Sequence, residues 1–137
     1  MRGRWPRSSR RGQAGVATVE AVLVVPLVLV PVLVAVVVFG QLVHVRTVLD
    51  AAAAAGARQA AVAGADGPTV RGRIATELAD GGVSPSSVSI TVEPAVAAWG
   101  QPIRVRVATT GRASIPFLGS WSVPLASEFV TRSEVTH

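Results

Sequence analysis

The sequence predicts a membrane-anchored α+β fold within a single chain of 137 residues. Two observations lead to this prediction. An arginine-rich start is followed by an apolar run at residues 21–39 that has no charged or hydrogen-bonding side chain. Further on, segments alternate apolar and polar residues with the period of two that is typical of half-buried strands. We therefore expect a long N-terminal helix, a short second helix and a small antiparallel sheet.

The composition excludes several classes of protein. With 50% hydrophobic and 15% charged residues, the chain is too apolar to be disordered. The absence of cysteine excludes disulfides, a thiolate nucleophile and sulfur-based zinc sites, and the two histidines leave little for an imidazole site. No phosphate-binding glycine loop or acyl-transfer triad can be assembled. We expect a protein that is not an enzyme and that has no cofactor, metal or small-molecule ligand.

The basic charge is concentrated at the start of the chain. The formal net charge is +5, and residues 1–15 contain no acid but five of the thirteen arginines: Arg2, Arg4, Arg7, Arg10 and Arg11. The remainder has eight arginines and eight acids, so it is neutral. Residues 1–15 are therefore predicted to form a basic cytoplasmic leader, because arginines that precede a membrane span favour the cytoplasmic side.

The apolar run is long enough to cross a bilayer, since nineteen helical residues extend about 28 Å. We expect a transmembrane helix over residues 16–43. A cleaved secretory signal is the alternative, but its apolar region is usually about 7 to 15 residues and ends in a small-x-small site that is absent here. Pro26 and Pro31 each remove a backbone hydrogen bond. They predict a kinked or locally opened helix, either in lipid or against partner helices.

A single acid, Glu20, directly precedes the apolar run. A carboxylate at a membrane boundary either extends into the headgroup layer or pairs with a cation. Gly15 ends the basic leader, four residues separate it from Glu20, and about twenty apolar residues follow. This arrangement resembles the class III signal of prepilins and pseudopilins. The wider stretch 11–21, together with Val25-Pro26-Leu27, Phe39-Gly40-Gln41-Leu42 and the alanine-rich residues 52–61, resembles the TadE family of Flp-type (tight adherence) pilus proteins.

The resemblance implies a pilin-like lollipop and a minor pilin or pseudopilin that acts in pilus assembly, adhesion or secretion. It implies cleavage between Gly15 and Val16, and pairing of Glu20 with the α-amino group of a neighbouring subunit. The implied partners are other pilins or pseudopilins, which bind through the N-terminal helix, a prepilin peptidase and the pilus assembly platform. The implied location is the cell membrane, crossed once with the C-terminus outside, or a surface pilus. The alternative is an uncleaved single-span protein whose exported domain binds another envelope component.

Residues 44–64 are predicted to continue the helix outside the membrane, because they are rich in alanine, the best helix former. Small residues recur there every four positions: Ala52, Gly56, Ala60 and Gly64. They leave one edge of the helix bare, so that another backbone could approach closely. An alanine-rich composition could also produce this stripe by chance.

Residues 65–137 are predicted to form a small exported α+β domain. Asp66 is the candidate N-cap of a second helix that ends at Gly81 and Gly82. Its apolar residues fall on one face: Val70, Ile74 and Leu78. Alternation predicts strands over 88–92 and 103–107, and a less regular edge strand over 127–135. Residues 115–125 are predicted to form an apolar loop that covers the core, or else touches a partner or the membrane.

Arginines and tryptophans in this domain raise the question of nucleic-acid binding. Such a surface needs a basic patch and aromatic stacking platforms, for which the candidates are Arg104, Arg106, Arg112, Trp99 and Trp121. Arginines that alternate along the open face of a strand explain the pattern more simply. The sequence therefore disfavours a nucleic-acid partner.

Overall fold

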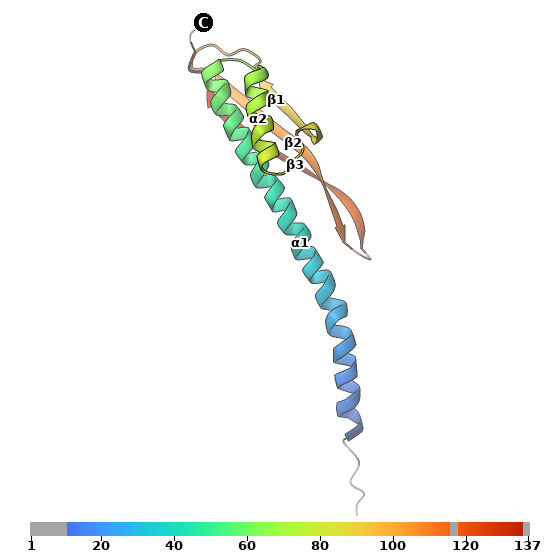
Figure 1. Ribbon diagram of the computed structural model, residues 1–137. Helices are drawn as coiled ribbons and strands as arrows, with labels where there is room; N and C mark the ends of the chain where they lie inside the picture. Colours follow the sequence, from blue (N-terminus) through green and yellow to red (C-terminus); the bar gives the residue numbers. More distant parts are fainter. Residues whose placement is uncertain (1–10, 116–117, 136–137) are drawn as a thin grey trace, which may run out of the picture.

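The computed structural model describes residues 11–115 and 118–135. Its elements are α1 (Arg11–Ala63), α2 (Pro68–Asp80), the 3-10 helix η1 (Pro85–Ser87), β1 (Val88–Glu93), β2 (Pro102–Ile115) and β3 (Gly119–Arg132). Figure 1 shows α1 as a long rod whose C-terminal end packs against α2 and the sheet. The predicted fold class, a long apolar helix with a small α+β domain, is confirmed.

Helix α1 runs for 53 residues without interruption and contains Pro26 and Pro31 in its interior. The helix assignment continues through both prolines, although each of them lacks the N–H that would close a helical hydrogen bond. Beyond Ala63, Gly64 has a φ of 67°, and its N–H donates to the Ala60 carbonyl at 2.8 Å. Glycine suits this position because the left-handed conformation that ends many helices strains residues with a Cβ atom.

Helix α2 buries the predicted face, with Val70, Ile74 and Leu78 fully inaccessible to solvent. Its start differs from the prediction. The N-cap is Gly67, without a side-chain cap, rather than Asp66. The carboxylate of Asp66 instead accepts hydrogen bonds from Arg71 at 2.6 and 3.2 Å. This hydrogen-bonded ion pair raises the pKa of Arg71.

The sheet has the order β1-β2-β3, and both pairs of strands are antiparallel. One face packs on the helices, because Ile103, Val105 and Val107 of β2 are fully buried while the residues between them are exposed. In the register, Val105 lies opposite Val92 of β1 and Phe129 of β3. The alternation predicted for the first two strands is therefore observed, with β2 in the middle.

The predicted loop over 115–125 is wrong. Ile115 is the last residue of β2, and β3 begins at Gly119, so most of this segment is paired strand. Pro124 lies within β3 opposite Thr110. A residue without an N–H is tolerated there because β3 is an edge strand, one side of which has no ladder partner. The third strand accordingly starts before residue 127, where it was expected, and ends at Arg132.

The domain is attached to α1 at two levels. At the C-terminal end of α1, the Ala97 N–H donates to the Gly64 carbonyl and the Glu134 N–H donates to the Ala61 carbonyl. Nearer the apolar run, Nε2 of His44 hydrogen-bonds to the carbonyl of Gly81, just beyond α2. The last two turns of α2 therefore lie beside the part of α1 that follows the apolar run.

Candidate functional site on the N-terminal helix

The segment with the predicted processing site lies at the start of α1. The helix begins at Arg11, so the bond between Gly15 and Val16 lies within its first two turns. Glu20 follows about 7.5 Å further along the axis, at 1.5 Å per residue. Its side chain is exposed, and none of the side chains that the structure describes forms an ion pair with it. The carboxylate is thus accessible to a group outside this chain.

Beyond Glu20 the helix exposes a continuous apolar surface. Val22 and Leu27, for example, are 67% and 75% exposed. Val22–Ala63 is long and apolar enough to cross a membrane, and its most apolar 18-residue window has a mean hydropathy of 3.3 and contains no fully buried residue. Exposed apolar surface of this extent requires lipid or other helices around it. The helix therefore has the length and the exposed apolar surface of a membrane anchor.

The small-residue edge of α1 is covered within the chain. Ala52 and Ala60 are fully buried, and Gly56 and Gly64 are buried as well. A Cβ atom on Gly56 would lie only 2.5 Å from Cγ1 of Ile74. The edge therefore provides the close approach that α2 needs, rather than a free surface for another chain.

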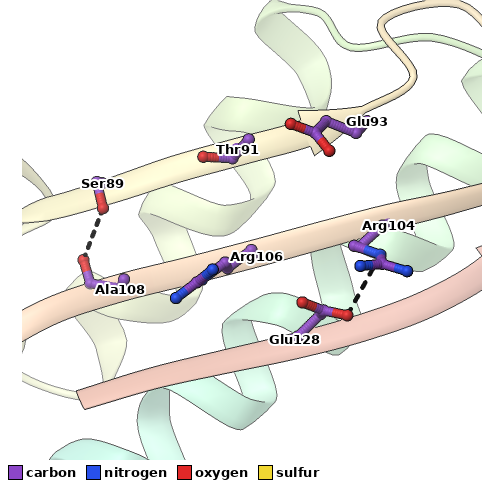
Figure 2. A pocket seen from close by; sticks show the side chains of 7 residues that line it. All are labelled: Ser89, Thr91, Glu93, Arg104, Arg106, Ala108 and Glu128. Carbon is purple, nitrogen blue, oxygen red and sulfur yellow. Dashed lines mark hydrogen bonds and ion pairs between the residues drawn. The ribbon is translucent and has the colours of Figure 1, made fainter. Parts of the chain in front are cut away.

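The outer face of the sheet carries a shallow polar groove, which Figure 2 shows. Nε of Arg104 lies 3.3 Å from Oε1 of Glu128, and the register places Glu93 opposite Arg104 and Glu128 opposite Arg106. Opposite charges on neighbouring strands stabilise a sheet modestly. An exposed ion pair such as this one contributes little to the free energy of folding. The two glutamates were not predicted as partners of the arginines, because the pairing depends on the register of the strands.

The two tryptophans considered for nucleic-acid binding do not lie on the face that carries Arg104 and Arg106. Trp121 lies opposite Ala113, which is 1% exposed and belongs to the helix-facing side of β2. Trp99 lies in the turn between β1 and β2. The groove therefore combines balanced charges with no aromatic stacking platform among the residues that line it.

The possible metal ligands are scattered in the part of the chain that the structure describes. Within 11–115 and 118–135, no group of three or more His, Asp or Glu could hold a metal ion. His44 binds the carbonyl of Gly81, and His137 lies outside the described residues.

Residues 15–58 match the family model described as TadE-like protein. The match begins at Gly15, includes Glu20 and the apolar part of α1, and ends in the alanine-rich part at Arg58. The TadE-like resemblance is thus confirmed over this segment, which indicates a protein associated with a Tad pilus. No curated protein and no solved structure matches the chain.

Proposed function

We propose that this TadE-like chain is a minor pilin or pseudopilin of a Flp-type (Tad) pilus, and that it acts by assembling with other pilins through α1. The N-terminus lies in the cytoplasm and the domain outside, as the arginines before the membrane helix favour. The role is structural rather than catalytic. The observation that carries the proposal is the family match, which starts at Gly15 and includes Glu20 at the head of an exposed apolar helix.

In this proposal a prepilin peptidase cleaves between Gly15 and Val16. The bond lies near the end of α1, where helices open at little cost in free energy. Cleavage removes the five arginines of residues 1–15 and leaves a chain with no formal net charge. It also creates an α-amino group four residues before Glu20, at the edge of the apolar run.

Assembly then places α1 among sister helices, which cover the apolar surface that lipid covered before. Glu20 pairs with the α-amino group of a neighbouring subunit, in surroundings where an unpaired charge would be costly. Pro26 and Pro31 each leave one carbonyl of α1 without an intrahelical N–H donor. Neighbouring helices can satisfy such carbonyls. The assembly platform, which moves subunits out of the membrane, is the third expected partner.

The mature mass tests the processing step. With a tag at the C-terminus, cells that contain the prepilin peptidase should yield a chain that lacks residues 1–15, and cells without it should yield the full chain. Gly15→Val should block the cleavage, because a branched side chain obstructs the position next to the bond. Gly12→Val, at the other glycine near the end of the leader, is the matched control and should be cleaved normally. An unchanged mass in cells with the peptidase would contradict the proposal.

One observation favours a second candidate, an uncleaved single-span protein whose exported domain binds another envelope component. Arg11 to Gly15 belong to the same helix as the membrane span, so the end of the leader and the anchor form one element. Under this alternative the five arginines remain as a cytoplasmic anchor, and the full-length mass persists in the presence of the peptidase. The same mass measurement therefore separates the two candidates.

A further inference from the structure

The hairpin formed by β2 and β3 ends in exposed apolar side chains. Leu118, just before β3, is 71% exposed, and Trp121 in β3 is 46% exposed. Figure 1 shows this hairpin reaching back along α1 toward the N-terminal end of the helix, past the end of α2. Its end is therefore the part of the domain nearest to the apolar run.

Two contacts fix the level of the hairpin along α1. A Cβ atom on Gly56 would lie 3.5 Å from Cγ1 of Val105, and one on Gly111 would lie 2.9 Å from Cδ2 of Leu42. From Val105 to Gly111 the strand advances about 20 Å. From Gly56 to Leu42 the helix covers about 21 Å. These two distances are nearly equal, so β2 and α1 run side by side over this stretch.

The length per residue of strand and helix also locates the end of the hairpin along α1. From Gly111 to Ile115 the strand continues for about 13 Å, which corresponds to about nine helical residues below Leu42. This level falls well inside the apolar run of 21–39. The exposure of α1 supports it, because Val34 and Val38 are half-buried whereas Val36 and Val37 are exposed. One face of the membrane helix is therefore shielded down to this depth.

The chemistry of the hairpin end fits lipid. Residues 113–127 contain no charged side chain. The nearest charges along the strands are Arg112, which is exposed, and Glu128, much nearer the outer end. Tryptophan is enriched where hydrocarbon meets headgroups, because its ring is apolar and its N–H can still find a polar partner. An arginine just above that layer can reach the lipid phosphates.

We propose that Leu118 and Trp121, the described apolar residues at the start of the returning strand of the β2–β3 hairpin, insert into the interface of the membrane leaflet next to the folded domain. The domain then contacts the bilayer through both α1 and the hairpin. These two contacts fix the tilt of the domain relative to the membrane. Lipid is the occupant because α1 holds the hairpin end at the depth of the span, where lipid is the surrounding medium in the unassembled subunit. The inference needs only the membrane anchor and does not depend on a role in a pilus.

Fluorescence quenching tests the proposal in the full chain. The variant with Trp5→Phe and Trp99→Phe retains Trp121 as its sole tryptophan. The matched control, with Trp5→Phe and Trp121→Phe, retains Trp99, which is 68% exposed in the turn at the outer end of the domain. Each variant is placed as one copy per phosphatidylcholine nanodisc, so that no second copy can cover the hairpin.

Bilayers whose acyl chains are brominated near the headgroup should quench Trp121 and leave Trp99 unchanged. Aqueous iodide should show the reverse preference. If Trp121 is as accessible to iodide as Trp99 and is not quenched by brominated lipid, the hairpin stands in water and the proposal is wrong. If Trp121 is shielded from both quenchers, protein covers it instead of lipid, which also overturns the proposal.

Discussion

Replacing Gly56 with alanine is expected to lower the free energy of unfolding of the exported domain by about 1–3 kcal/mol, the usual cost of overpacking a core. The added methyl group would lie 2.5 and 2.6 Å from Cγ1 and Cδ1 of Ile74. Ile74 cannot move aside easily, because it is fully buried between α1 and the sheet. Alanine is intrinsically the better helix former, so a net loss of stability would come from the packing alone.

The same substitution at Gly72 is the matched control. Gly72 lies inside α2, and a Cβ atom there would meet nothing within 4 Å. Gly72→Ala should therefore raise the free energy of unfolding by about 0.5–1 kcal/mol through helix propensity. Urea unfolding of the full chain in detergent, followed by tryptophan fluorescence, measures both variants. Equal stabilisation by the two substitutions would show that α2 does not pack against α1 at Gly56.

Local patterns were sufficient to predict most of the secondary structure. The spacing of four residues that places Val70, Ile74 and Leu78 on one face predicted the buried side of α2 correctly. The alternation around Val105 likewise predicted the buried side of β2. These predictions succeed because a helix or strand next to a core repeats its burial with its own period, and that period is visible in the sequence alone.

The errors arose where a local preference competed with another interaction. Pro124 argued against a strand, yet it is accommodated because β3 happens to be an edge, which only the strand order reveals. Asp66 fits the sequence preferences of an N-cap, but its carboxylate binds Arg71 instead. In the first case the strand order overruled a local preference, and in the second a competing side-chain pair only five residues apart did so.

The candidate site likewise has features that the sequence could predict and features that it could not. The positions of Gly15 and Glu20 relative to the apolar run were visible in the sequence, because a membrane span and its flanking charges are linear features. The cover of the small-residue edge by Ile74 and the depth of Trp121 were not visible. Both depend on which segments fold back along α1, and Gly111 beside Leu42 is the contact that fixes the depth of the hairpin.

Glu20→Gln is expected to abolish co-assembly with other pilins while leaving processing intact. Glutamine has nearly the same shape as glutamate but no charge, so the α-amino group of the neighbouring subunit would be buried without a counter-ion. Removing one partner of a buried ion pair typically costs about 3–5 kcal/mol, which is a loss of more than about 100-fold in association. Co-purification of the tagged chain with sister pilins measures the loss, and the mature mass from the same cells reports on processing.

Asp50→Asn is the matched control, because Asp50 is an exposed carboxylate on the same helix, outside the apolar run. Its neutralisation changes the net charge of the chain by the same amount and should leave co-assembly unchanged. If both variants assembled normally, the carboxylate of Glu20 would merely extend into the headgroups, and α1 would be a simple anchor. If both failed, the loss would reflect net charge rather than a specific pair. Only a defect confined to Glu20→Gln supports an ion pair at the membrane boundary as the contact that aligns neighbouring subunits.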